Sequence, residues 1–275
     1  MIAQQQPAAP PGRLRLLLAA QAPLAAVAGQ QAAQWLTGSE QARLAGMHNP
    51  ARRVEFIACR WALRHLLAAG SDIPASDWRL DAPEGRAPHL NAEHHGAQAA
   101  AATHLSLTHS GAWLACAAAP YPVGIDLEVK DLAHRGRRDV LALAAMACTP
   151  GETAQLQALD EGAERQRHFL QIWSLKEAYF KCTGTGVDFS VIRRIECMPA
   201  AQAGQGQVLA HARSWHGATA DGHGVLLSVC RLPGADDSLT SASPTQTDAG
   251  IAWQGEDAWH LAGLPNWQAS ECREG

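Results

Sequence analysis

The hydrophobic positions of the chain follow two periods, one typical of helices and one typical of strands. Apolar residues recur at helical spacing through residues 39–69 and stop at Gly70, so this region is predicted to be helical. Leu14, Leu16 and Leu18 recur at every second position, which predicts a first strand near the start of the chain. The polar, Pro- and Gly-containing stretch that follows the helical region is expected to lack long elements.

The middle of the chain predicts strands followed by a long helical region. The stretch HLSLTHSGAWLACAAAP indicates two strands joined by a Ser-Gly turn, and VGIDLEV indicates a third strand. Residues 137–182 are predicted to be helical, with a break at CTPGE, where Thr149, Pro150 and Glu152 are typical of a helix start. Short strands are then expected near residues 189–197, 207–213 and 224–232.

The two ends of the chain differ in composition from its body. Residues 1–12 are expected to form a flexible leader, and although the next residues resemble a signal peptide, Gln21 and Pro23 interrupt their apolar run. From Pro233 the chain becomes polar, which predicts a linker. The last segment carries three tryptophans, Trp253, Trp259 and Trp267. It is expected either to fold back, to bind a partner or to remain a poorly ordered extension.

Composition excludes some classes of protein. The 275 residues are 47% hydrophobic but contain no apolar run long enough for a membrane span, so no membrane partner is expected. A net charge of −4 argues against a general nucleic-acid binder. The seven cysteines form no CxxC pair and lie mostly in apolar contexts, which predicts buried, reduced thiols and a cytoplasmic protein.

Two local runs are basic despite the negative net charge. Four arginines and one acid lie between Arg52 and Arg64, and HRGRR at residues 134–138 forms a second run. Each run could contact an anionic partner, or each could be an ordinary solvated surface.

Two carboxylates stand close together in the third predicted strand. Asp126 and Glu128 are two residues apart in GIDLE, so their side chains point to the same face. They would repel each other, and each would have a raised pKa unless a cation neutralised them. The alternative is an edge strand that exposes two acids to water.

A third carboxylate and a lysine lie on the long helix, in WSLKEAYFK. Glu177 and Lys181 are one turn apart and share a face, and as a surface pair they would contribute only about 0.3–0.5 kcal/mol. Together with the strand carboxylates they could instead form a site for a hard cation such as Mg²⁺, which shares its oxygen ligands with substrate phosphates. The combination indicates phosphate chemistry.

These two motifs, VGIDLE and WSLKEAYFKCTGTG, resemble the paired signatures of the 4′-phosphopantetheinyl transferases, and in particular the larger single-chain class. The segments RRVEFIACRWALRHLL, EGRAPHL and LSLTHSGAW resemble further segments of that family. The resemblance implies an α+β fold of two pseudo-symmetric halves that meet at the active site, at residues 13–122 and 123–232. The leader and residues 233–275 lie outside it.

The resemblance also implies roles for individual residues. The Mg²⁺ ligands would be Asp126, Glu128 and Glu177. The residues that bind coenzyme A, chiefly through its phosphates, would be Arg53, Arg60, Arg86, Thr108, His109, Lys176 and Lys181. Glu177 and Lys181 would be catalytic, and Glu152 would be the general base unless it serves only as the acid at its helix N-terminus. Two departures from the family pattern are Cys59, which replaces a glycine, and one extra residue in GRAP.

The implied reaction moves the phosphopantetheine arm of coenzyme A onto a serine of an apo acyl or peptidyl carrier protein and releases adenosine 3′,5′-bisphosphate. Because carrier proteins are acidic, Arg135, Arg137 or Arg138 is expected to help dock the carrier. We expect a monomer. The alternatives are a carrier-binding scaffold that has lost activity and a different Mg²⁺-dependent phosphotransferase, which no Walker-type glycine loop supports.

Overall fold

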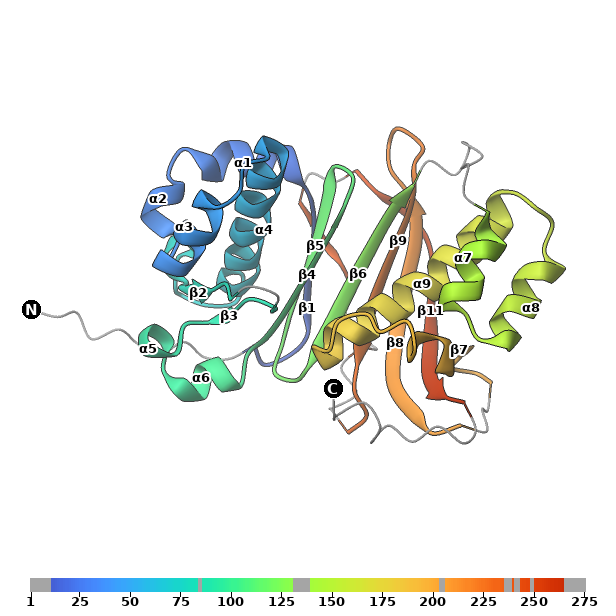
Figure 1. Cartoon of the computed structure of the whole chain (residues 1–275). Coiled ribbons are helices and arrows are strands. Elements are labelled where there is room, and N and C mark those ends of the chain that lie inside the picture. The colour runs from blue at the N-terminus through green and yellow to red at the C-terminus, as the bar shows by residue number, and fades with distance from the viewer. Residues whose placement is uncertain are drawn as a thin grey trace, which may run out of the picture. The chain divides into compact units, whose positions relative to one another are not determined.

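The structure, a computed structural model, describes residues 11–83, 86–130, 139–202, 206–234, 239, 243–247 and 250–264. The chain forms two compact units that divide between Val123 and Gly124 (Figure 1). Residues 243–247 belong to the first unit, and residues 250–264 belong to the second. Both units contain helices and sheets, so the predicted α+β class is confirmed, whereas the pseudo-symmetry of the two halves stays a prediction.

The first unit packs helices against one face of a sheet. The strands are β1 (Arg15–Ala20), β4 (His104–Ser110), β5 (Trp113–Ala119) and β10 (Thr245–Thr247), in the order β10-β1-β5-β4, and a separate pair joins β2 (Leu80–Asp81) to β3 (His89–Leu90). The helices are α1 (Gln21–Gly29), α2 (Ala32–Trp35), α3 (Gly38–Ala45), α4 (Pro50–Ala68), α5 (Ala92–His95) and α6 (Ala97–Ala101). A 3-10 turn spans Ala75–Asp77.

Local sequence explains the main elements of this unit. The predicted first strand is confirmed as β1, and the predicted Ser-Gly turn joins β4 to β5, where Gly111 has a φ of 58°, a conformation that favours glycine. Asn49 caps the start of α4 and Pro50 occupies its first turn. Buried residues of α4, among them Leu63, pack with the sheet residues of the same unit.

Two arginines of the basic run, Arg60 and Arg64, are buried rather than exposed. Arg64 donates to both oxygens of Glu40, at 2.6 and 3.1 Å, and neither side chain is exposed to solvent. Glu40 also closes a capping box with Thr37 at the start of α3. This pair therefore fixes α3 against α4, because each charge has a bidentate partner.

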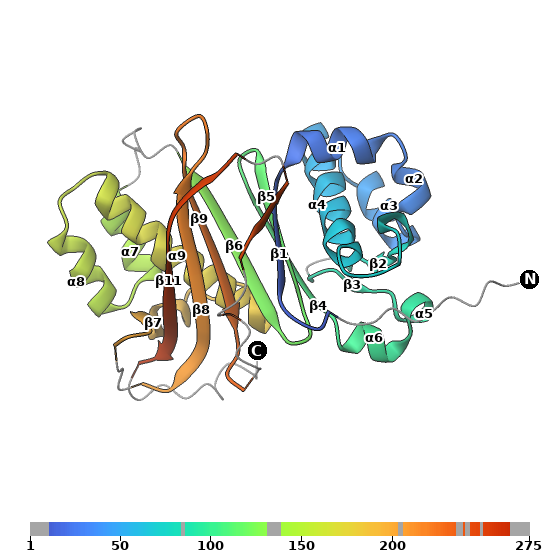
Figure 2. The same ribbon diagram turned by 180° about the vertical axis from the view of Figure 1, so that it is seen from behind.

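The second unit also places its helices on one face of a sheet, as the view from behind shows (Figure 2). Its strands are β6 (Val123–Lys130), β7 (Ile195–Pro199), β8 (Val208–Ala218), β9 (Gly224–Arg231) and β11 (Ala252–Gly263), in the order β6-β9-β8-β11-β7. Its helices are α7 (Val140–Ala147), α8 (Pro150–Ala158) and α9 (Ala163–Thr183), and a 3-10 turn spans Ile192–Arg194. No described helix combines the length and apolar character needed to cross a membrane.

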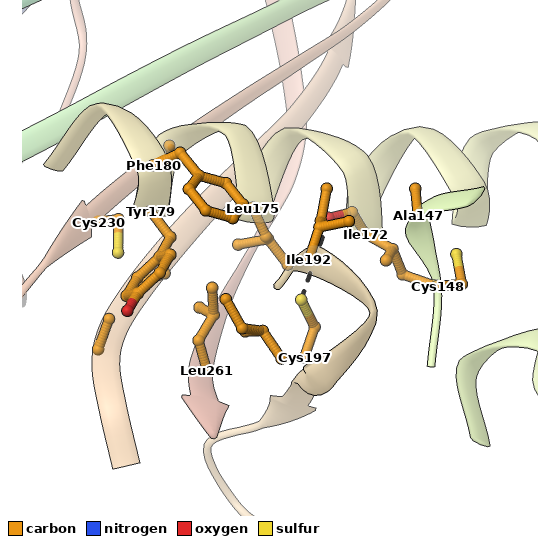
Figure 3. Close-up of a cluster of buried hydrophobic side chains, with 14 of the residues drawn as sticks. Ala147, Cys148, Ile172, Leu175, Tyr179, Phe180, Ile192, Cys197, Cys230 and Leu261 are labelled. Atoms are coloured by element: carbon orange, nitrogen blue, oxygen red, sulfur yellow. Dashed lines mark hydrogen bonds between the residues drawn. The ribbon is translucent and has the colours of Figure 1, made fainter. Parts of the chain in front are cut away.

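The core of the second unit forms between α9 and the sheet. Figure 3 shows Ile172 and Leu175 of α9 on the side of the helix that faces Cys197 of β7 and Leu261 of β11. The six described cysteines of the chain are buried, in agreement with the expectation from composition. Burial raises the pKa of Cys59 and of Cys148 to about 12, so neither thiol is reactive.

Part of the segment that the sequence identified as a linker and tail is an internal strand. Strand β11 lies between β8 and β7 and pairs with both. The Trp259 indole donates to Ser214 Oγ at 2.9 Å, and the Gln171 amide of α9 donates to the same oxygen at 3.0 Å. Of the alternatives for the Trp-containing segment, folding back therefore holds for Ala252–Gly263, because long-range pairing, not local apolar content, makes this segment a strand.

We predict that Leu261→Ala lowers the free energy of unfolding by about 2–5 kcal/mol, because it leaves a cavity in a fully buried position of β11. Urea or thermal unfolding measures the change. The matched control is Gln254→Ala on the exposed side of the same strand, which should change stability by less than about 0.5 kcal/mol. Equal effects of the two substitutions would show that β11 does not contribute to the core.

Candidate active site

A close backbone approach brings α9 against β6. A side chain at Gly124 would place its Cβ 1.8 Å from the carbonyl oxygen of Ala178 and 2.5 Å from the backbone nitrogen of Cys182. Both atoms belong to the α9 backbone and cannot move aside as a flexible side chain can. Glycine is therefore required here, and its absence of a side chain sets the distance between the strand and the helix.

The predicted strand carboxylates and the predicted helix pair meet at this contact. The Lys181 ammonium donates to Asp126 Oδ1 at 2.6 Å and lies 3.8 Å from Glu177 Oε2. Asp126 is 5% exposed, whereas the Lys181 side chain is 30% exposed. The strand also provides its own cation, because Lys130 Nζ lies 3.1 Å from Glu128 Oε2. Both predicted motifs thus contribute to one cluster of charges.

Among the described residues, the cluster holds three carboxylates and two lysine ammonium groups. Burial, and then the neighbouring Asp126 carboxylate, raise the pKa of Glu128. Burial is also the main cause that raises the pKa of Glu177, and the carboxylates of Asp126 and Glu128 raise it further against the opposing effect of Lys181. Glu128 and Glu177 therefore bind protons more readily than ordinary glutamates, and an additional cation would stabilise their ionised forms.

The three carboxylates fit a hard divalent ion in their chemistry, although they are not arranged around a metal position. Three carboxylates on adjacent elements offer the oxygen ligands that Mg²⁺ prefers. Within the described ranges, no group of three or more His, Cys, Asp or Glu side chains is already gathered around a metal position. The Lys181 ammonium instead supplies the positive charge beside Asp126 and Glu177, so Mg²⁺ would have to replace it there.

Lys176 and Glu152 form a separate buried ion pair. Lys176 Nζ donates to Glu152 Oε2 at 2.6 Å, to Ala147 O at 2.9 Å and to Ile192 O at 3.1 Å, which uses all three of its protons. Glu152 also accepts from the backbone of Thr149 and of Cys197. Both residues are completely buried. The structure therefore gives them a structural role, and neither the phosphate contact nor the base role fits unless this pair opens.

The candidate residues for binding coenzyme A in the first unit occupy different environments. Arg60 is 4% exposed, its guanidinium lies over the Phe56 ring, and its Nε lies 3.9 Å from Glu40 Oε1. Among the described residues, its Nε and Nη1 atoms have no hydrogen-bond partner. Burial lowers the pKa of Arg60 to about 10. Thr108 is buried in β4, and His109 follows it with its side chain 35% exposed. Arg60 is therefore a charged donor with unused hydrogen-bonding capacity.

The structure separates the two arginines at the start of α4. Arg53 donates to the carbonyl oxygens of Leu44 and Met47, and so closes the end of α3. Arg52 extends away and contacts Glu55, which also contacts His109. Arg52 and Glu55 were not predicted, although their spacing of three residues on a helix indicates a shared face.

Two predicted residues or groups lie at the margin of the described chain. Arg86 is exposed in the loop between β2 and β3, directly after residues 84–85, which lie outside the described residues. Arg135, Arg137 and Arg138, the candidates for carrier docking, also lie outside them, so their role stays a prediction.

Comparison with known proteins identifies the region that contains this cluster. Residues 122–230 match the model of the 4′-phosphopantetheinyl transferase superfamily. Over 154 residues, or 55% of this chain, the sequence is 30% identical to a putative 4′-phosphopantetheinyl transferase of Synechocystis sp., of which 58% is covered. It is 30% identical over 159 residues, or 58% of this chain, to the 4′-phosphopantetheinyl transferase HetI of Nostoc sp., of which 63% is covered.

A shorter match is stronger in identity. The chain is 38% identical over 90 residues, or 32% of its length, to the 4′-phosphopantetheinyl transferase psf-1 of Bacillus pumilus, of which 35% is covered. In all three comparisons the chain therefore spans less than two thirds of the relative's own length.

We predict that Gly124→Ala lowers the free energy of unfolding by at least about 1–3 kcal/mol, because the methyl group would overlap the α9 backbone. Thermal unfolding of the full chain measures the loss. The control is Gly38→Ala, at a helical position where a Cβ meets no atom, and it should change stability by less than about 0.5 kcal/mol. A neutral Gly124→Ala would contradict the close approach.

We predict that Lys176→Met lowers the free energy of unfolding by about 3–5 kcal/mol, because it leaves the Glu152 carboxylate buried without its cation. The double variant with Glu152→Gln should recover part of this loss, since no uncompensated charge remains. Denaturant unfolding of both variants tests the buried pair. A fully stable Lys176→Met protein would instead favour an exposed, substrate-contacting lysine.

Proposed function

We propose that the chain belongs to the 4′-phosphopantetheinyl transferase superfamily, whose model matches residues 122–230, and that it transfers the 4′-phosphopantetheine arm of coenzyme A to a carrier protein. The acceptor is a serine of an apo acyl or peptidyl carrier protein, as for a holo-[acyl-carrier-protein] synthase, and the other product is adenosine 3′,5′-bisphosphate. The observation that carries the proposal is the contact of Asp126 and Glu177 with Lys181 inside the matched region.

In this proposal Asp126, Glu128 and Glu177 hold Mg²⁺. The ion, when bound, would offset negative charge on the pyrophosphate of coenzyme A. The raised pKa values of Glu128 and Glu177, caused mainly by burial and further by neighbouring carboxylates, support this assignment, because a bound cation would stabilise the ionised forms. Lys181 would leave Asp126 and donate to a phosphate oxygen, where it would stabilise the charge of the leaving bisphosphate.

The reaction exchanges one phosphorus–oxygen bond for another. The carrier serine oxygen forms a bond with the β-phosphorus, the bond from that phosphorus to the bisphosphate breaks, and the serine proton passes to a base. We do not assign that base to Glu152, because three donors already occupy its buried carboxylate. Most of the rate enhancement would come from positioning and electrostatic stabilisation.

The first unit would bind the phosphates of coenzyme A. Arg60, Arg86, Thr108 and His109 are the proposed contacts. Arg60 is supported by its buried guanidinium: within the described part of the chain its Nε and Nη1 have no hydrogen-bond partner, Glu40 Oε1 lying 3.9 Å away, and an anion would satisfy them. Arg53 has less support, since carbonyl oxygens already accept from its guanidinium.

The proposed protein partner is an acidic carrier. The basic run at residues 134–138 leads into α7, whose Met146 is 54% exposed on an entirely apolar helix. Charge complementarity with the carrier and contact with this apolar surface would together favour docking. We further propose a cytoplasmic monomer without a nucleic-acid or membrane partner.

We predict that incubation with coenzyme A, Mg²⁺ and a panel of apo carrier proteins adds the mass of phosphopantetheine to a carrier serine. Glu177→Gln should lower the turnover by at least about 10³-fold, because it removes a charged metal ligand. Mass spectrometry measures the transfer, and calorimetric titration with Mg²⁺ in the presence of coenzyme A measures the loss of metal binding.

Lys181→Met is the companion variant. Because Lys181 competes with a cation for Asp126, its removal should preserve or tighten Mg²⁺ binding to the protein alone while it lowers turnover. Carrier binding without any transfer by the unaltered protein would favour the inactive scaffold. Full activity of Glu177→Gln with Mg²⁺ would rule out its role as a ligand.

A further inference from the structure

A single carboxylate in the first unit contacts an arginine and a histidine. Glu55 Oε1 accepts from Arg52 Nη1 at 2.8 Å and lies 3.1 Å from His109 Nε2. Arg52 and Glu55 share one face of α4, whereas His109 lies near the end of β4. Glu55 therefore connects a helix to a strand at the position where the proposed function places a phosphate contact.

The three side chains differ in their exposure to solvent. The Arg52 side chain is 63% exposed and that of His109 is 35% exposed, but that of Glu55 is only 21% exposed. The Arg52 and His109 side chains thus reach solvent, whereas the Glu55 carboxylate is more deeply buried. An anion that approaches from solvent would meet these two side chains before it meets the carboxylate.

We propose that Glu55 is a positioning residue that holds Arg52 and His109 as a pair of cations for a phosphate group of coenzyme A. This inference rests on the proposed function and extends its phosphate site to Arg52 and Glu55. A carboxylate beside an imidazole favours the protonated ring and fixes its orientation. The Arg52 guanidinium has five N–H donors, so the contact with one carboxylate oxygen leaves donors that can bind a phosphate.

A solvated ion pair explains the arrangement less well. An exposed pair three residues apart on a helix contributes only about 0–1 kcal/mol and needs no third member. Here the same oxygen receives both the helix cation and a histidine from another element. The neighbouring Arg53 cannot take the place of Arg52 without losing its bonds to two carbonyl oxygens.

We predict that Glu55→Gln weakens the binding of coenzyme A to the full chain by about tenfold, because it loosens two charge-assisted contacts to phosphate. Isothermal titration calorimetry with coenzyme A measures the Kd. His109→Gln should have an effect of similar size, and the double variant, in which Glu55 no longer holds Arg52 either, should lose less affinity than the sum of the two single losses. Such non-additivity is expected only if Glu55 acts through His109.

Two controls separate positioning from stability. Glu93→Gln removes an exposed acid of α5 in the same unit and should leave the Kd unchanged. Glu55→Asp keeps the carboxylate and should retain most of the affinity, which also covers the case in which Glu55→Gln does not fold. Titration with dephospho-coenzyme A, which lacks the 3′-phosphate, identifies the phosphate concerned, because Glu55→Gln should not affect its Kd if that group is the ligand.

The outcomes distinguish this inference from the proposed function. If the unaltered protein binds coenzyme A but Glu55→Gln binds it equally well, or if the losses in the double variant simply add, the positioning role is wrong and the proposed function stands. If the unaltered protein does not bind coenzyme A, both proposals are wrong.

Discussion

The contact between Gly124 and the backbone of α9 is the constraint on which the candidate site depends. Any side chain at this position would overlap the carbonyl of Ala178, so the strand and helix can approach only because glycine has none. This approach allows Lys181, on α9, to reach Asp126, on β6, at 2.6 Å. The geometry of the charges is thus set by a backbone contact rather than by the charges themselves, because three of them are carboxylates that repel one another.

The two lysines of WSLKEAYFK lie on one helix but in different environments. Lys176 is fully buried, and each of its three ammonium protons has an acceptor, one of which is the Glu152 carboxylate. Lys181 is partly exposed and belongs to a cluster that, among the described residues, has three carboxylates and two lysines, and burial there raises the pKa of Glu128 and of Glu177. A satisfied pair stabilises a fold, whereas an unbalanced cluster can bind a further cation.

The sequence could predict the elements whose periodicity is local, and it identified the strand and helix that carry the cluster. It could not distinguish Lys176 from Lys181, since burial depends on which side of α9 meets the core. Strand β11 was missed because its place between β8 and β7 is defined by pairing with distant residues. Glu55 was missed for the same reason, because its significance lies in a contact with His109 that helical spacing does not reveal.

The position of Lys181 has a consequence for how the proposed ligands would bind. Mg²⁺ alone would have to displace the Lys181 ammonium from Asp126, which would separate the lysine from its closest carboxylate. A phosphate group would give Lys181 a new acceptor at the same time as the metal takes its place beside the carboxylates. We therefore expect Mg²⁺ and coenzyme A to bind with positive coupling, and by linkage each must strengthen the other by the same factor. Lys181 would then act as an exchangeable cation. Before the substrate binds, it would neutralise the carboxylates, and afterwards it would neutralise a phosphate of the substrate.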